Sequence, residues 1–540
     1  MNTSPRSRSF WHTGITPTPY PPLRDNVTAD VCVIGGGIAG MTSAWLLSKA
    51  GFSVAVLEAL DLAAGETSRS TAHIAVPDDR YWVIERDHGI DGAQQVAASF
   101  AAAIDQIESI VREARISCDF ARVDGYLVSC ADDPDAALQR ELEAAQRAGV
   151  VVEKVDAAHG FSGLGPALRF PHQAQFHPFS YLTGLAAALP RKCALFEGTR
   201  ALAIDEFDDH AIVRTTGGTV RADWVIVATN TPFNERFGLH VRQFAYQTYV
   251  VAGLVPRGSV PQILVWDDGD PYHYIRTAPY DERADVVIVG GEDHKTGHET
   301  DTLSSYAALE TWIAQHLPAL KSIHWHWSGE IIEPLDGLAN LGREPGSKRT
   351  FVISGDSGNG ITHATIGASL ISAQIQGVRL PWEKVYDPAR SQAKHFPHLL
   401  KEQADIASQY TDWLSAGDAP DVGEIGFDSG AVIRHGLTKI AVYRDNHGDL
   451  FAHSATCPHL GCIVQWNPAE RTWDCPCHGS RFSAYGALLH GPAQHGLSSL
   501  NQPSRLERLS EDAAEADEED AAQRSRDTKE QERARQRNPD

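Results

Sequence analysis

The feature that most constrains the fold is a set of three glycines, Gly35, Gly37 and Gly40, spaced as G-x-G-x-x-G. They follow a short apolar run typical of a buried strand, and the residues after them have the apolar spacing of a helix. A second apolar run then ends at Glu58. Strand, glycine-rich turn, helix and strand in this order predict an α/β unit with parallel strands.

Each glycine of this motif has a mechanical purpose. Gly35 permits a tight turn, Gly37 lets the main chain approach a pyrophosphate, and Gly40 lets the helix pack closely on the strand. The helix N-terminus offers N–H groups to phosphate, and Glu58 is placed to accept hydrogen bonds from a ribose diol. The alternative is a glycine-rich turn that matches the spacing by chance. The strand, helix and acidic residue in register favour dinucleotide binding, although FAD and NAD share this pattern.

Length and charge restrict the class of protein. A chain of 540 residues is too long for one hydrophobic core, so two or three domains are expected. Its net charge of -23 argues against nucleic acid or an anionic membrane surface as a partner. No apolar run is long enough for a membrane span. Arg6 and Arg8 precede prolines rather than the apolar core of a signal peptide, so we expect a cytoplasmic protein.

The remaining pattern divides the chain into segments. An α/β domain with an antiparallel second layer between about residues 150 and 350 is expected first. A linker over residues 380–423 and a small all-β module over 424–506 follow, and the charged tail 507–540 is expected to be disordered or a lone helix. Helical spacing or buried apolar runs support this division at 93–114, 135–148, 224–228, 286–289 and 351–354.

A glycine-rich turn near the end of the α/β domain distinguishes FAD from NAD as the bound dinucleotide. The run TFVIS leads into Gly355-Asp356-Ser357-Gly358-Asn359-Gly360 and then a predicted helix. This segment resembles the closing flavin-binding segment of the D-amino-acid oxidase and glycine oxidase family of FAD-dependent oxidoreductases. The resemblance implies that Gly355, Asp356 and Gly360 lie near the flavin, with the helix N-terminus stabilising the anionic reduced form.

Two further segments are similar to the same family. Residues 64–71, which include Ser68 and Arg69, match the loop that passes the FAD phosphates, and 225–230 (VIVATN) resembles the strand that covers the adenine half. The likeness spans about residues 29–375, and no second G-x-G-x-x-G suggests a separate NAD(P)H unit. It implies an N-terminal extension over 1–28 and an FAD-dependent oxidoreductase domain over 29–379, with FAD-binding parts at about 29–90, 195–235 and 345–379 and a substrate layer at 91–194 and 236–344.

The substrate residues are less defined by the sequence. Tyr272, Tyr274 and Arg276 alternate on a predicted strand and so share one face. The family has a similar tyrosine and arginine over the flavin, which implies catalytic roles for Tyr274 and Arg276, with Arg276 holding a substrate carboxylate. The alternative is an edge strand with a solvated face. His73 lies where some relatives attach flavin covalently, but an ordinary polar loop histidine is the favoured interpretation.

A second motif combines cysteine and histidine. Cys457 and His459 form C-x-H, and Cys475 and His478 form C-x-x-H. Two thiolates and two imidazoles are also a zinc set, but structural zinc sites usually leave two to four residues between paired ligands. Each loop also carries one additional cysteine, and Ser480 is placed to donate its hydroxyl to a cluster sulfur. These details favour iron over zinc.

The run resembles the Rieske domains of cytochrome bc complexes. The resemblance implies a 2Fe-2S cluster with Cys457 and Cys475 on one iron and His459 and His478 on the other. It also implies a disulfide between Cys462 and Cys477, and a covering loop at residues 491–493. One departure is Phe482, which stands where high-potential members have a tyrosine that donates to a ligand sulfur. Loss of that donor predicts a lower, intermediate potential.

A two-electron flavin joined to a one-electron cluster suggests an enzyme with divided labour. By family resemblance, FAD takes a hydride from an amine or amino-acid-type small molecule, and the cluster passes electrons singly to an external acceptor protein. Two alternatives stay open. The cluster feeds the flavin in an electron-transfer reductase, or the flavin domain is an oxidase with a structural or redox-sensing Rieske module. A Rieske oxygenase is disfavoured because no convincing two-histidine, one-carboxylate iron site is visible.

Overall fold

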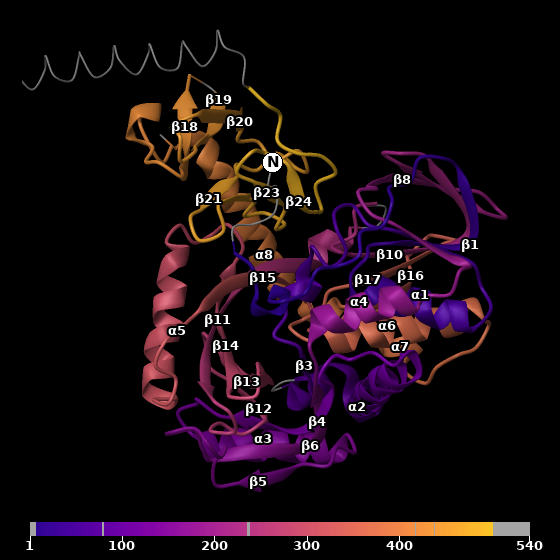
Figure 1. The fold of residues 1–540 in the computed structure, drawn as a ribbon, viewed down its shortest axis with the longest axis vertical. Coiled ribbons are helices and arrows are strands. Elements are labelled where there is room, and N and C mark those ends of the chain that lie inside the picture. Colours follow the sequence, from indigo (N-terminus) through magenta and orange to yellow (C-terminus); the bar gives the residue numbers. More distant parts are fainter. Residues whose placement is uncertain (1–6, 78–79, 235–237, 416, 437, 501–540) are drawn as a thin grey trace, which may run out of the picture.

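The computed structural model describes residues 7–77, 80–234, 238–415, 417–436 and 438–500. Two large sheets form the first three quarters of the chain, and a small all-β module packs against both of them (Figure 1). This arrangement confirms the predicted α/β fold with a mixed second sheet and a separate C-terminal β module. The expected tail, 507–540, lies outside the described residues.

The first sheet contains the predicted βαβ unit. Its central strands run in the order β17-β10-β1-β2-β7, and all of these pairs are parallel. The apolar residues of β1 are buried on both faces, which explains the continuous apolar run in the sequence. The strands of this sheet are β1 (Val27–Ile34), β2 (Val54–Leu57), β7 (Cys193–Phe196), β8 (Ala201–Glu206), β9 (Ala211–Thr215), β10 (Thr219–Asn230), β16 (Asn340–Arg343) and β17 (Thr350–Ser354).

The second sheet is mostly antiparallel. Its order is β15-β11-β14-β13-β12-β4-β6-β3, with β5 paired to β6, and only β12 and β4 run parallel. Its strands are β3 (His73–Ile74), β4 (Ala121–Val128), β5 (Glu153–Val155), β6 (Ala167–Gln175), β11 (Gln243–Pro256), β12 (Leu264–Asp267), β13 (His273–Pro279), β14 (Ala284–Lys295) and β15 (Trp325–Pro334).

Helices cover the two large sheets. The helices α1 and α6 pack side by side on the first sheet, and α5 lies along β14 and β11 of the second (Figure 1). The predicted helix 93–114 is the second part of α2, which begins earlier and breaks at Gly89. The helices are α1 (Ile38–Lys49), α2 (Tyr81–Ala114), α3 (Pro134–Arg147), α4 (Pro178–Ala188), α5 (Thr302–His316), α6 (Gly360–Ile375), α7 (Glu383–Tyr386) and α8 (Phe396–Gln409). Within the described ranges, no helix is both long and apolar enough to cross a membrane.

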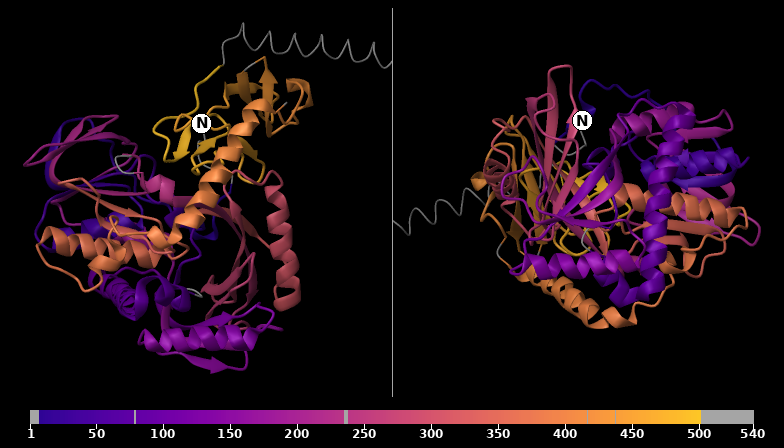
Figure 2. Two further views of the ribbon diagram at one scale, coloured as in Figure 1. Left: turned by 180° about the vertical axis from the view of Figure 1, so that it is seen from behind. Right: turned by 90° about the horizontal axis from the view of Figure 1, so that it is seen from below.

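The segment expected as an irregular linker contains a substantial helix. Helix α8 lies within residues 380–423 and runs between the large sheets and the C-terminal module (Figure 2). It buries Ile406, and Lys295 of β14 forms ion pairs with Glu402 and Asp405 at 2.7 and 2.6 Å. The mixture of aromatic, proline and acidic residues concealed this helix.

Short 3₁₀ helices, three of them near α8, are η1 (Phe10–His12), η2 (Glu66–Ser68), η3 (Leu239–Arg242), η4 (Ala393–His395), η5 (Tyr410–Leu414) and η6 (Val422–Glu424).

The C-terminal module consists of two antiparallel sheets. One holds β18 (Ser429–His435), β19 (Thr438–Arg444) and β20 (Leu450–Ser454), and the other holds β21 (Gln465–Asn467), β22 (Thr472–Asp474), β23 (Arg481–Ser483) and β24 (Leu488–His490). The strands of the second sheet are only three residues long. The loops between them therefore make up much of the module, and these loops carry the cysteine and histidine motif.

Candidate functional site

The three glycines of the first motif are close-packed, as their proposed roles require. Gly35 has a φ of +114°, and a Cβ built there would lie 2.3 Å from the carbonyl oxygen of Ala228 on β10. A Cβ at Gly40 would lie 1.9 Å from the carbonyl oxygen of Gly35. Only glycine fits either position. Gly37 is the N-cap of α1 and leaves the helix N-terminus facing a large cavity.

Glu58 closes the same turn. Its Oε2 atom accepts a hydrogen bond from the Gly36 N–H at 2.7 Å, and its Oε1 atom accepts one from the Leu60 N–H at 2.8 Å. Burial raises the pKa of this carboxyl group. The side chain lies at the end of β2 and lines the cavity.

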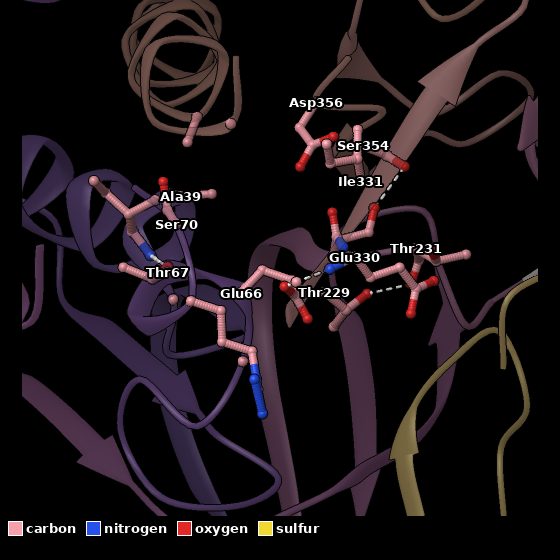
Figure 3. Close-up of a pocket in the computed structure, with 18 of the residues that line it drawn as sticks. Ala39, Glu66, Thr67, Ser70, Thr229, Thr231, Glu330, Ile331, Ser354 and Asp356 are labelled. Atoms are coloured by element: carbon pink, nitrogen blue, oxygen red, sulfur yellow. Dashed lines mark hydrogen bonds between the residues drawn. The ribbon is translucent and has the colours of Figure 1, made fainter. Parts of the chain in front are cut away.

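The cavity has a volume of about 540 Å³ and extends between the two large sheets. Its walls come from the turns after β1, β2, β10 and β17 and from the second sheet, and Figure 3 shows Glu66, Glu330 and Asp356 around it. Of the residues predicted from sequence, Gly35, Gly37, Glu58, Arg69, Gly355, Asp356, Gly360 and Tyr274 line the cavity, whereas Gly40, Ser68 and Arg276 do not.

The closing segment contributes one wall. Asp356 follows β17, and its Oδ1 atom accepts a hydrogen bond from the Ile332 N–H at 2.9 Å. Burial raises the pKa of Asp356 to about 7. Helix α6 begins at Gly360, so its N-terminus also faces the cavity. Two helix N-termini therefore approach the same space, which suits a ligand with separated negative groups.

The wall from the second sheet is aromatic and polar. The Tyr274 hydroxyl lies 2.8 Å from Thr248 Oγ1, and its ring meets the His73 ring edge-to-face at 5.6 Å. His73 is bonded within the protein: Nε2 lies 3.1 Å from the Ile275 carbonyl oxygen and Nδ1 lies 3.1 Å from Thr71 Oγ1. Burial lowers the pKa of His73 to about 3, so this imidazole is neutral. These bonds support the interpretation of His73 as an ordinary, non-covalent wall residue.

Arg276 is placed differently from the prediction. Its Nη1 atom donates to the carbonyl oxygens of Thr71, Ala72 and Phe176 at 2.9, 2.8 and 3.1 Å. Its guanidinium group also lies over the ring of Trp11 at 5.2 Å, and the side chain is fully buried outside the cavity wall. Arg276 therefore fastens main-chain segments together, which disagrees with the expected role of holding a substrate carboxylate.

The loop after β2 also differs in detail. Ser68 turns back, its Oγ donating to the Gly65 carbonyl oxygen at 3.3 Å, and so does not reach the cavity. Arg69 lines the cavity but also crosses to the C-terminal module. Its Nη2 atom lies 3.3 Å from Glu470 Oε2, and both side chains are buried. Thr67, rather than Ser68, connects this loop to the glycine turn, because its Oγ1 accepts a hydrogen bond from the Ile38 N–H at 3.0 Å.

The cysteine and histidine motif brings four potential ligands together, of which Cys457, Cys475 and His478 are buried and His459 is half-buried. Cys457 and Cys475 are buried, and a hydrogen bond with Cys475 lowers the pKa of Cys457, with a smaller contribution from Ser480. The rings of His459 and His478 are 4.9 Å apart. Two adjacent thiols and two adjacent imidazoles on two loops are the donor set of a 2Fe-2S cluster with mixed ligands.

The supporting groups surround this donor set. Cys462 and Cys477 form the expected disulfide, with a Cα–Cα distance of 6.4 Å. Their sulfur atoms and that of Cys475 lie within 4.8 Å of one another, so the disulfide is next to a ligand. The covering loop is held to the second ligand loop, since the Ala493 N–H donates to Ser480 Oγ at 3.0 Å. Phe482 is fully buried on β23.

The cavity and the ligand cluster share a boundary that the sequence did not indicate. Leu489 and His490 at the end of β24, Gly491 and Ala493 of the covering loop, and the following Gln494 line the cavity. His490 Nε2 lies 3.2 Å from Glu66 Oε1, which joins the module to the loop after β2.

Glu330 is a further residue of this boundary that was not predicted. A Cβ built at Gly479, next to the ligand His478, would lie 2.6 Å from Glu330 Oε1. Glu330 itself lines the cavity, is buried, and has a pKa raised by that burial. The one available signal was that Glu330 directly precedes the apolar pair Ile331-Ile332, because a carboxylate that is buried is rare without a functional or structural reason.

Comparisons with known proteins identify both parts. Residues 30–374 match the family described as FAD dependent oxidoreductase, and residues 415–501 match the Rieske [2Fe-2S] domain. The Rieske 2Fe-2S iron-sulfur protein YhfW of Bacillus subtilis strain 168 is 29% identical over 503 residues, which cover 91% of this chain and 97% of that protein.

Two further similarities concern the first part alone. Gamma-glutamylputrescine oxidoreductase of Escherichia coli strain K12 is 26% identical over 380 residues, covering 66% of this chain and 86% of that protein. The crystal structure of glycine oxidase from Geobacillus kaustophilus matches with a TM-score of 0.59 and 18% identity, covering 68% of this chain and 99% of that one. The glycine oxidase likeness concerns the fold.

Proposed function

Because this chain belongs to the FAD dependent oxidoreductase family and carries a C-terminal Rieske domain, we propose that it is a dehydrogenase that passes electrons from a substrate to an external one-electron carrier. The two domains bind FAD and a 2Fe-2S cluster, and the glycine turns and the donor set described above fit these groups. Bound FAD accepts a hydride, and the cluster carries one electron at a time.

The shared boundary carries this proposal. Gly479 stands next to the ligand His478 and packs on Glu330 of the FAD cavity. Ser480, which contacts the ligand Cys457, is bonded to the covering loop that lines the same cavity. A module that served only as an appendage would not need to form the cofactor wall. The contact supports a relay between the two centres within one chain.

The substrate class is proposed to be an amine or amino acid. The family and the relative named gamma-glutamylputrescine oxidoreductase support this class. An amine must lose its ammonium proton before a hydride can leave the neighbouring carbon, so a proton acceptor is needed at the cavity.

Asp293 suits this role. Its Oδ2 atom accepts a hydrogen bond from the Tyr272 hydroxyl at 2.7 Å, and Tyr272 lines the cavity beside Tyr274. Burial raises the pKa of Asp293 to about 7, which is close to the operating pH of a general base. We assign Asp293 the task of receiving the substrate proton through Tyr272, while Tyr274 orients the amine.

The proposed function is tested with the purified holoenzyme under anaerobic conditions. Amines and amino acids are added one by one while flavin absorbance is followed, and the reduced cluster is detected by electron paramagnetic resonance. Bleaching of the flavin followed by the cluster signal is expected. Bleaching that never produces the cluster signal would refute the relay, and reduction of the flavin by a reduced carrier but by no amine would identify an electron-transfer reductase instead.

Two variants sharpen this test. Cys457→Ser removes one cluster ligand and should retain flavin bleaching while abolishing the cluster signal. Asp293→Asn should slow flavin reduction most above about pH 7, where Asp293 is ionised while the amine is still protonated, and the defect should shrink at lower pH as the Asp293 carboxyl of the unaltered chain becomes protonated. The cluster spectrum should be unchanged. Equal pH profiles for Asp293→Asn and the unaltered chain would exclude Asp293 as the proton acceptor.

A further inference from the structure

A third histidine packs against the two histidine ligands of the cluster. The ring of His240 lies 5.1 Å from that of His459 and 5.3 Å from that of His478, with interplanar angles of 82° and 73°. The two ligand rings meet each other at 88°. The three imidazoles therefore form an edge-to-face set, a favourable geometry for aromatic rings. His240 belongs to the FAD domain, whereas the ligands belong to the Rieske domain.

The segment that carries His240 is fixed to the FAD cavity. His240 lies on η3, which continues directly into β11 at Gln243. Gln243 Oε1 accepts a hydrogen bond from the Ser354 hydroxyl at 3.0 Å, and both residues are buried. Ser354 lines the cavity. The segment that carries His240 is therefore tied to the cavity wall three residues after His240.

Neighbouring contacts hold the Rieske domain in the same position. A Cβ at Gly479, adjacent to His478, would come within 2.3 Å of the Ala245 Cβ on β11. In the same ligand loop, between the ligands Cys475 and His478, the Pro476 carbonyl oxygen lies 3.1 Å from His298 Nε2. The histidine edge of the cluster consequently faces the FAD domain along β11 and the segment before it.

We propose that His240 is a positioning residue that holds both cluster imidazoles against the FAD domain, so that the histidine edge is an internal junction. An external carrier then exchanges electrons with the cluster at another edge. The inference concerns how the cluster is held and is independent of which substrate reduces the flavin or of the direction of electron flow.

The experiment compares holoenzymes carrying His240→Ala, His240→Phe and His298→Ala. The reduced cluster is examined by electron paramagnetic resonance after dithionite treatment, and its redox midpoint is titrated. In a separate measurement the flavin is photoreduced and the appearance of the cluster signal is timed. None of these measurements requires a substrate, so their failure is separate from failure of the proposed function.

His240→Ala is expected to shift the g-values of the cluster and to slow its reduction by photoreduced flavin on the order of tenfold, because two ring contacts are lost. His240→Phe keeps an edge-to-face ring and should resemble the unaltered chain. His298→Ala removes a histidine that crosses the same junction without touching an imidazole ligand, and should leave the g-values unchanged.

Two results would overturn the proposal. One is a His240→Ala chain with full iron content whose g-values, midpoint and transfer rate equal those of the unaltered chain. The other applies where His240→Ala fails to assemble the cluster. In that case His240→Phe must restore cluster assembly with native g-values. If the His240→Phe variant also fails to assemble the cluster, the ring contact is not what positions the ligands.

Discussion

Replacing Glu470 by glutamine is expected to loosen the Rieske domain from the FAD domain. Glu470 is fully buried in the turn between β21 and β22, and Arg69 of the FAD domain reaches it at 3.3 Å. Its Oε1 atom also accepts a hydrogen bond from the Ser328 N–H at 3.1 Å. The Glu470→Gln change keeps the volume but removes the counter-charge of a buried arginine.

The magnitude follows from the burial of both partners. Breaking a buried ion pair by removing one member costs about 3–5 kcal/mol, because the other charge is left uncompensated. Arg69 retains the Ser328 carbonyl oxygen at 2.6 Å as an acceptor, so the lower figure of about 3 kcal/mol applies. For a domain as small as the Rieske domain, which spans residues 415–501, that loss corresponds to a fall of roughly 12–24 °C in the thermal midpoint.

The effect has a defined dependence on pH. Burial raises the pKa of Glu470, but Arg69, Arg481 and hydrogen bonds outweigh it, so the pKa lies below its ordinary value of 4.5. A carboxyl group with a depressed folded pKa stabilises the protein above its unfolded pKa and loses this contribution as the pH falls through the folded value. The difference in thermal midpoint between the unaltered protein and Glu470→Gln should therefore be constant from neutral pH to about 5 and should narrow below about 4.5.

The assay follows cluster absorbance during heating at several pH values. Asp208→Asn serves as the control, because Asp208 forms an exposed ion pair with Lys348 and its loss should leave the midpoint unchanged. A fall of less than about 2 °C for Glu470→Gln would contradict the calculation. A difference in thermal midpoint between the two proteins that stays constant below about pH 4.5 would contradict it as well.

Three further outcomes are expected. Phe482→Tyr should raise the redox midpoint of the cluster, because it adds a hydroxyl donor near the ligand sulfurs at a fully buried position. An unchanged midpoint in a redox titration would refute this reasoning. The double change Cys462→Ser and Cys477→Ser keeps all four ligands but opens a loop with a separation of 15 residues, so the free energy of unfolding should fall by about 3 kcal/mol. The cluster should then be lost at a lower denaturant concentration, and an unaltered denaturation midpoint would contradict this. Acid precipitation should release all flavin into the supernatant, since both nitrogens of His73 are bonded within the protein; flavin retained in the pellet would indicate a covalent link.

The features that the sequence predicted well are local ones. The glycine turn is built from residues within one strand-turn-helix unit, and its requirements at Gly35 and Gly40 are steric. The cluster ligands Cys457 to His478 come from two loops of one short segment, so their spacing alone nearly determines the donor set. In both cases the contacts that matter connect neighbours in the chain.

The features that were missed depend on contacts between distant segments. Alternation placed Arg276 on the same face as Tyr274, but it could not show that carbonyl oxygens of residues 100 to 205 positions away would meet the guanidinium group. His240 and Glu330 belong to no motif, and their importance arises only when the Rieske domain docks. Period-two patterning identifies a face of a strand, whereas the tertiary fold decides what that face touches.

The docking also changes which experiment can separate the two domains. Truncation before the Rieske domain is the direct way to ask whether the FAD domain works alone. It would, however, remove the partner of buried Arg69 and the covering-loop residues that close the FAD cavity. Loss of activity after truncation would then follow from a damaged cofactor site as readily as from a missing electron relay. Single changes at the ligand Cys457 or at His240 leave these walls in place, and they therefore separate electron transfer from structural support.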